Sequence, residues 1–126
     1  MTKIETSNAP GAIGPYSQGM VSGKLVFTSG QIPLDPATGA IVGDTIEEQS
    51  EQALKNLQAV LEAGGAALTT VVKTTCFLSD MNNFAAFNAV YATYFSGDCP
   101  ARSCVAVKTL PKNVLVEVEA VAESLK

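Results

Sequence analysis

The segment Pro100–Cys104 carries the residue whose type and position most clearly suggest chemistry. Pro100 fixes the backbone at the start of a predicted strand, so Arg102 emerges from a stiff strand edge rather than from a loop. A guanidinium recognises planar anions through two parallel hydrogen bonds, and carboxylate is the commonest such anion. Two interpretations stay open here: Arg102 forms an internal ion pair or a subunit contact, or it binds a carboxylate ligand.

Two carboxylates share one side of the last predicted strand. Alternation over residues 114–121 puts one apolar set on one face, and the other face carries Leu115, Glu117, Glu119 and Val121. Either this second face is simply exposed to water, or one of the two glutamates is partly buried near Arg102. In the second case the glutamate has the environment that a water-activating base needs.

Four further residues are candidates for a site. Tyr16 follows Pro15, so a rigid backbone places its ring, which either packs with its hydroxyl in water or lines a site. Ser29 ends a buried strand, where its hydroxyl either donates to a ligand or bonds to its own backbone. Gly30 permits a sharp bend and the close approach of a ligand. Asn88 falls on an apolar helix face, where a buried amide must either clamp a neighbouring loop or contact a ligand.

The sequence contains no histidine, which excludes the usual metal sites and every histidine-based acid, base or triad. The three cysteines form no CxxC pair, and their odd number predicts reduced thiols. Cys76 is most simply a small core residue. Cys104 is a candidate nucleophile, but its usual activating base is missing.

Composition bounds the partners. The chain of 126 residues predicts a single domain spanning 1–126, and its 47% hydrophobic content suggests that some apolar surface lies between subunits. A net charge of -4 without any basic run disfavours binding to nucleic acid. No signal-peptide pattern and no apolar run of membrane length occur, so we expect a cytoplasmic protein without a membrane partner.

The elements that must position these residues follow from periodicity and turn signals. We expect a short edge strand at residues 3–5, a hairpin of 17–21 and 24–28, and strands at 71–78, 102–107 and 114–121. A helix begins at Asp44 or Thr45 and ends at Gly64-Gly65, with Glu51 and Lys55 paired on its exposed face; a second runs from Asp80–Asn83 to Gly97. The order predicts an α+β fold with two helices on one face of a mixed, mostly antiparallel sheet. The other face then needs a partner, which points to an oligomer.

Four blocks, taken in this order, resemble the RidA/YjgF family of enamine/imine deaminases. They are Ala12–Gln18, Phe27–Pro33, Pro100–Cys104 and Val116–Ala122. Residues 72–75 and 110–112 add to the resemblance, which covers nearly the whole chain.

The resemblance implies a chorismate-mutase-like subunit, a homotrimer and a site in each cleft between neighbours. It implies hydrolysis of 2-imino acids (2-iminopropanoate and 2-iminobutanoate) and of enamines such as 2-aminoacrylate to 2-oxo acids and ammonia, without cofactor or metal. These intermediates leak from pyridoxal-phosphate dehydratases and can inactivate other pyridoxal-phosphate enzymes. In this reading Arg102 holds the substrate carboxylate and Glu117 positions or activates the water. Tyr16, Ser29 and the Cys104 backbone line the pocket, with Gly30 and Asn88 nearby.

Two other functions compete with this one. A non-catalytic trimer could bind 2-oxo acids or similar carboxylates through the same Arg102 pocket. Ribonuclease, translation-inhibitor or chaperone roles have also been attached to the family, but the acidic charge and the missing basic patch count against work on RNA.

Overall fold

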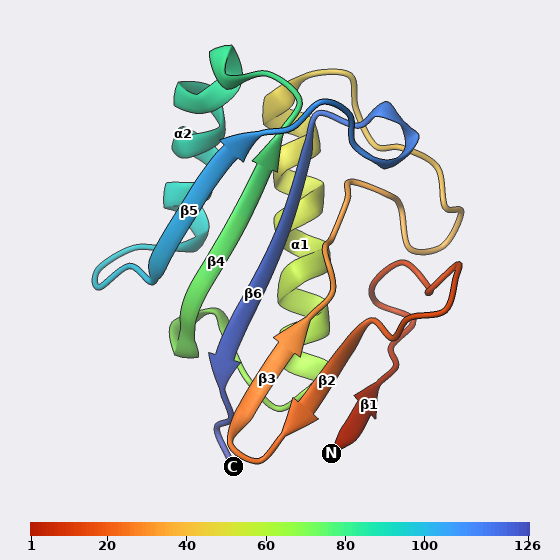
Figure 1. Cartoon of the computed structure of the whole chain (residues 1–126), viewed down its shortest axis with the longest axis vertical. Coiled ribbons are helices and arrows are strands. Elements are labelled where there is room, and N and C mark those ends of the chain that lie inside the picture. Colours follow the sequence, from red (N-terminus) through yellow and green to blue (C-terminus); the bar gives the residue numbers. More distant parts are fainter.

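The computed structural model describes residues 1–126 as one six-stranded sheet with two α-helices on one of its faces (Figure 1). The strands are β1 (Thr2–Ile4), β2 (Gly19–Ser22), β3 (Leu25–Thr28), β4 (Val71–Leu78), β5 (Ala101–Ala106) and β6 (Val116–Glu123), and the α-helices are α1 (Ile46–Ala63) and α2 (Phe84–Tyr94). Short 3-10 helices cover Leu68–Thr70, Met81–Asn83 and Pro111–Asn113. The strand order is β1-β2-β3-β6-β4-β5, and only β4 and β5 run parallel. The predicted α+β class with a mixed, mostly antiparallel sheet is therefore confirmed.

Helix α1 begins and ends as its sequence predicts. Thr45 is the N-cap, and its hydroxyl accepts a hydrogen bond from the Glu48 N–H, while Gly64 closes the other end. The predicted surface pair of Glu51 with Lys55 is wrong, because the Glu51 carboxylate accepts a hydrogen bond of 2.5 Å from the Tyr94 hydroxyl of α2. Neither α1 nor α2 is both long enough and apolar enough to cross a lipid bilayer.

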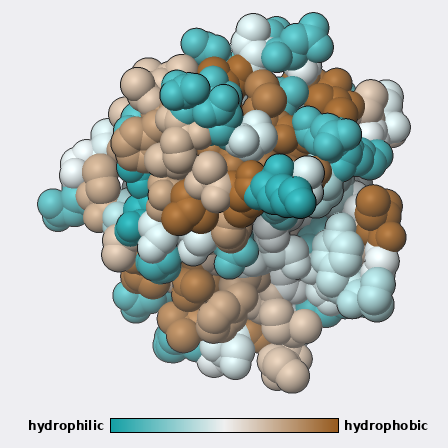
Figure 2. Space-filling view, turned by 45° about the horizontal axis from the view of Figure 1, so that its top comes forward, coloured by the Kyte–Doolittle hydropathy of each residue, from teal (hydrophilic) through white to brown (hydrophobic).

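The two faces of the sheet have different surroundings. Strand β6 buries Val116, Val118, Ala120 and Ala122 against the helices, and its alternate residues point to the other face. No helix covers that other face, where Phe27 and Val105 are 40% and 47% exposed. Figure 2 shows hydrophobic atoms in patches among hydrophilic ones on this side of the molecule, with its upper end tilted forward. Apolar side chains thus remain on the uncovered face of the sheet.

The segment after β3 is fastened to both layers of the fold. The Gln31 N–H donates to the Val118 carbonyl oxygen at 2.8 Å, and the Val118 N–H donates back to the Gln31 carbonyl oxygen at 3.1 Å. The buried Asn56 side chain on α1 donates to the carbonyl oxygens of Ile32 and Leu34, each at 3.0 Å. These contacts fix the backbone that follows Ser29 and Gly30.

Replacing Asn56 by Leu removes the donor for both carbonyl oxygens, so we expect the free energy of unfolding to fall by about 1–3 kcal/mol. Urea denaturation followed by circular dichroism measures this loss. Gln58→Leu is the matched control, because it makes the same change on α1 where the amide bonds only to Glu62, and we expect it to stay within about 0.5 kcal/mol of the parent. Equal losses in the two variants would contradict the anchoring role of Asn56.

Candidate functional site

Arg102 lies half buried on the edge strand β5, against one face of α2. Its Nη1 atom donates to the Asn88 Oδ1 atom at 2.7 Å, and its guanidinium carbon lies 4.8 Å from the Tyr91 ring centroid and 5.5 Å from that of Phe84. The chain's one ion pair joins Lys3 to Glu5, so the interpretation of Arg102 as an internal ion pair is wrong. A guanidinium has five N–H donors, and a single hydrogen bond to the protein leaves most of them free. Arg102 therefore offers an uncompensated positive charge with a free donor fork.

The Asn88 side chain does not clamp a neighbouring loop. Its amide oxygen contacts the Arg102 side chain on a strand, not a neighbouring loop. An amide oxygen accepts a hydrogen bond without adding negative charge. Asn88 thus holds the cation in place and leaves its charge available.

The Glu117 carboxylate lies against the backbone of Gly30. A Cβ atom at position 30 would overlap this carboxylate, so the contact requires glycine. Glu117 is half buried and has no ion pair in the chain. Burial raises the pKa of the Glu117 carboxyl, and the like charge of Glu119 raises it further. These are the properties of a carboxylate that can accept a proton from water.

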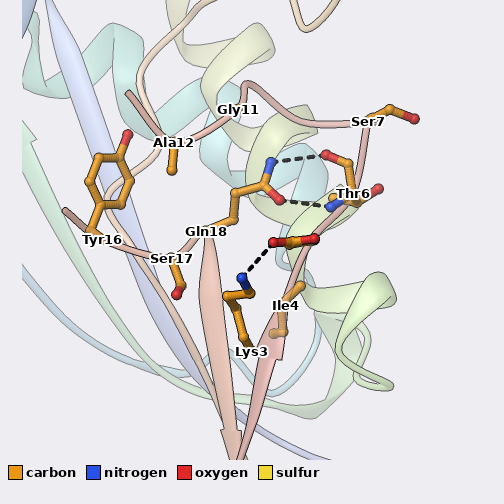
Figure 3. Close-up of a pocket in the computed structure, with 10 residues that line it drawn as sticks. Lys3, Ile4, Thr6, Ser7, Gly11, Ala12, Tyr16, Ser17 and Gln18 are labelled. Carbon is orange, nitrogen blue, oxygen red and sulfur yellow. Dashed lines mark hydrogen bonds and ion pairs between the residues drawn. The ribbon is translucent and has the colours of Figure 1, made fainter. Parts of the chain in front are cut away.

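Tyr16 lies beside Gly30 at the edge of a polar hollow. The two residues line one small cavity of about 40 Å³. Tyr16 also borders a larger pocket of about 420 Å³ between the N-terminal segment and Gln18, where it stands on the side opposite Thr6 and Ser7 (Figure 3). Its side chain is 50% exposed, so the hydroxyl is accessible. The close-up shows the Gln18 amide turned toward Thr6, which ties this loop to the N-terminal segment.

The Ser29 hydroxyl is already engaged with the backbone. It donates to the Ser17 carbonyl oxygen at 2.6 Å. The Ser29 hydroxyl is therefore bonded to backbone, as one alternative held, but to the backbone of a segment twelve residues away and not to its own. Its oxygen can still accept a hydrogen bond, but its proton is not free for a ligand.

Cys104 does not have the environment of a nucleophile. It pairs in register with Cys76 on β4 and packs against the hydrophobic core. Burial raises the pKa of the Cys104 thiol, and Arg102 only partly opposes this effect. Cys76 is fully buried, as predicted for a core residue, and its thiol pKa rises to about 12. No three His, Cys, Asp or Glu side chains are grouped so that they could hold a metal ion.

The candidate residues fall into two groups on opposite faces of the sheet. The arginine group (Arg102, Asn88 and Cys104) lies on the side of α2. The glutamate group (Glu117, Gly30, Tyr16 and Ser29) lies on the uncovered side and around the end of β3, since Glu117 pairs with Phe77 between the buried Cys76 and Leu78. One chain therefore does not bring Glu117 to Arg102.

Three residues near Arg102 received no site role from the sequence. These are Phe84 and Tyr91, whose rings face the guanidinium, and Thr74, which bonds to the Tyr91 hydroxyl. Phe84 and Tyr91 belong to the apolar helix face on which Asn88 falls. The sequence signal that could have found them is the polar Asn88 between two aromatic residues. Phe84, Asn88 and Tyr91 occupy positions i, i+4 and i+7 and so share one face of the helix.

Comparison with known proteins gives relatives along the whole chain. The family model described as Endoribonuclease L-PSP matches residues 6–124. A Salmonella typhimurium protein named 2-iminobutanoate/2-iminopropanoate deaminase is 51% identical over 122 residues, covering 94% of each chain.

Solved structures agree with this result. A Thermotoga maritima protein described as a candidate endoribonuclease has a TM-score of 0.96 at 52% identity, covering 100% of this chain and 99% of that one. Escherichia coli TdcF with bound serine has a TM-score of 0.93 at 46% identity, with 98% of both chains covered. On its sequence and its fold, the chain belongs to the RidA/YjgF family, whose family model bears the description Endoribonuclease L-PSP.

Proposed function

We propose that this protein hydrolyses 2-imino acids and their enamine tautomers to 2-oxo acids and ammonia. The observation that carries the proposal is Arg102, a half-buried cation that has an amide and two aromatic rings around it and no acidic partner. A carboxylate is the natural partner for such a guanidinium. In a 2-imino acid the carboxylate is bonded directly to the reacting carbon, so one anchor also fixes the C=N bond. The relatives named as deaminases support this substrate class.

The chemistry needs only modest help from the protein. An imine is already electrophilic, so hydrolysis requires orientation, a held water and proton transfer. The water oxygen bonds to the imine carbon while Glu117 takes a proton from it. That proton then moves to the nitrogen, which gives a carbinolamine. Glu117 takes the proton of the new hydroxyl and passes it to the amine, the C–N bond breaks as the C=O bond forms, and ammonia leaves the 2-oxo acid. Tyr16, Gly30, Ser29 and the Cys104 backbone line this site.

We place the site between two copies of the chain in a homotrimer. Arg102 and Glu117 project from opposite faces of one sheet, so one copy supplies the arginine group and its neighbour supplies the glutamate group. The apolar side chains that stay exposed on the uncovered face of the sheet, such as Phe27 and Val105, support such an assembly. In the cytoplasm this enzyme would remove imines released by pyridoxal-phosphate dehydratases before they inactivate other pyridoxal-phosphate enzymes.

A non-catalytic trimer that binds small carboxylates is the second candidate. The serine bound in the Escherichia coli TdcF structure favours it, because serine carries the same carboxylate without a C=N bond. The net charge of -4 and the absence of histidine argue against a ribonuclease, despite the description of the family model. Release of ammonia separates the two candidates.

Replacing Arg102 by Ala should lower kcat/KM by at least about a hundredfold, because the substrate carboxylate loses a charge-assisted pair of hydrogen bonds. An amino-acid oxidase generates 2-iminopropanoate, semicarbazide competes for it, and the fall in trapped product measures hydrolysis. Arg102→Lys keeps the charge without the fork and should recover only part of the activity. Lys108→Ala removes an exposed cation that follows the end of β5 and is the control.

If neither the parent nor the variant hydrolyses 2-iminopropanoate faster than the blank does, deaminase activity on this substrate is rejected. Binding of pyruvate to the parent protein under those conditions would then favour the binding module.

Replacing Glu117 by Gln should lower kcat by about a hundredfold and change the Kd for pyruvate by less than about threefold, because the amide cannot take a proton from water. The pH profile gives a second test. Glu119 raises the pKa of the Glu117 carboxyl, so Glu119→Gln should move the acid limb of kcat to lower pH. A limb that moves to higher pH or stays in place would contradict the role of Glu117 as the base.

Mixing Arg102→Ala and Glu117→Gln chains tests the shared site. In a trimeric ring that contains both variants, one of the three interfaces takes its arginine from the Glu117→Gln chain and its glutamate from the Arg102→Ala chain, so the mixed ring should reach about a third of parent activity. Co-expression with two different tags, followed by purification on both, provides the mixed ring. Each variant purified alone is the control. If the mixed ring is no more active than the Arg102→Ala and Glu117→Gln proteins purified alone, both residues act from one chain.

A further inference from the structure

Arg102, Thr74 and Tyr91 contact one another in turn: Arg102 pairs with Thr74 in the sheet, Thr74 bonds to Tyr91, and Tyr91 packs against Arg102. On β4 the register partner of Arg102 is Thr74, whose side chain is fully buried. The Thr74 hydroxyl shares a hydrogen bond of 2.8 Å with the Tyr91 hydroxyl, and the Tyr91 ring lies 4.8 Å from the Arg102 guanidinium carbon. The residue beside Arg102 in the sheet thus holds the ring on which Arg102 rests.

A second ring and an amide complete the enclosure. Phe84, Asn88 and Tyr91 occupy positions i, i+4 and i+7 of α2, so all three face β5. Aromatic faces attract a cation without carrying a net charge. They stabilise the half-buried guanidinium where a carboxylate would have neutralised it, and the charge stays available to an incoming anion.

The Tyr91 ring is itself confined. The centroid of the Phe95 ring lies 4.7 Å from the centroid of the Tyr91 ring, and the Tyr91 hydroxyl shares a hydrogen bond with the Thr74 hydroxyl. Burial raises the pKa of the Tyr91 hydroxyl, so it stays neutral and adds no negative charge beside Arg102. The ring therefore offers the guanidinium a fixed, uncharged platform.

We propose that Phe84, Tyr91 and Thr74 are positioning residues that orient the Arg102 guanidinium for a substrate carboxylate, with Thr74 acting through the Tyr91 hydroxyl. This inference rests on the proposed carboxylate-binding role of Arg102. The three residues contact Arg102 or one another on the face of the sheet opposite Glu117, so their loss acts on carboxylate binding and leaves the proton transfer by Glu117 alone.

The first test distinguishes an effect of the aromatic ring of Phe84 from an effect of its size. We expect Phe84→Leu to raise the Kd for pyruvate, measured by titration calorimetry, and the KM for 2-iminopropanoate by about tenfold, with kcat within about twofold of the parent. Phe84→Tyr keeps the ring and should restore both values. Phe84→Met repeats the test with an unbranched side chain, in case Leu does not fold at this position.

The second test is a double-mutant cycle on the Thr74–Tyr91 hydrogen bond. We expect Thr74→Val and Tyr91→Phe each to raise the Kd for pyruvate by about threefold, and the double variant to raise it no further than either single change. Tyr94→Phe is the matched control, because it removes a hydroxyl bonded to Glu51 from the same helix, away from Arg102. We expect its Kd to equal that of the parent.

The outcomes keep the two proposals apart. If Arg102→Ala binds pyruvate as well as the parent does, the proposed function fails. If Arg102→Ala abolishes binding while Phe84→Leu and Phe84→Met bind normally, or while Phe84→Tyr is as weak as Phe84→Leu, the positioning role fails alone. If the increases in the Kd for pyruvate caused by Thr74→Val and Tyr91→Phe multiply in the double variant, Thr74 does not act through Tyr91.

Discussion

The Arg102 guanidinium lies half buried with an amide oxygen and two aromatic rings around it, and this arrangement sets what the rest of the structure can do. Removing a cation from water is costly unless other groups replace its hydration. Carboxylates are common in this acidic chain, but none reaches Arg102, and neutral groups replace the hydration instead. The cation is therefore stabilised without being neutralised, which is what a receptor for a small carboxylate requires.

The pleat of the sheet imposes the second constraint. Successive side chains on a strand alternate between its faces, so Arg102 on β5 and Glu117 on β6 are fixed on opposite sides by the pairing of both strands with β4. Neither side chain can change face without moving a whole strand out of register. A site that used both residues would need another copy of the chain, so under the proposed function assembly is a condition for activity.

The groups available for proton transfer are few, and their environments differ. Burial disfavours the charged forms of the Cys104 thiol, the Tyr91 hydroxyl and the Glu117 carboxyl alike, but only a carboxyl can still ionise near neutral pH after such a shift. Glu117 also lies against Gly30, which lines a small cavity together with Tyr16. One fold can carry several functions, which the names of the relatives illustrate, so the proposed hydrolysis of imines depends on these groups and not on the fold.

The sequence by itself determined the elements, because hydrophobic periodicity, the cap at Thr45 and the turn that joins residues 17–21 to 24–28 act within a few residues of chain. It also singled out Arg102, Glu117, Gly30 and Asn88, and their blocks indicated the family. Only the tertiary structure decided that Asn88 binds Arg102, that Tyr91 and Phe84 lie under the guanidinium, and that Glu117 faces the other way. These facts depend on the register between strands far apart in sequence and on the packing of α2 against β5. Alternation fixes sides within one strand, but it does not say which side of one strand matches which side of another.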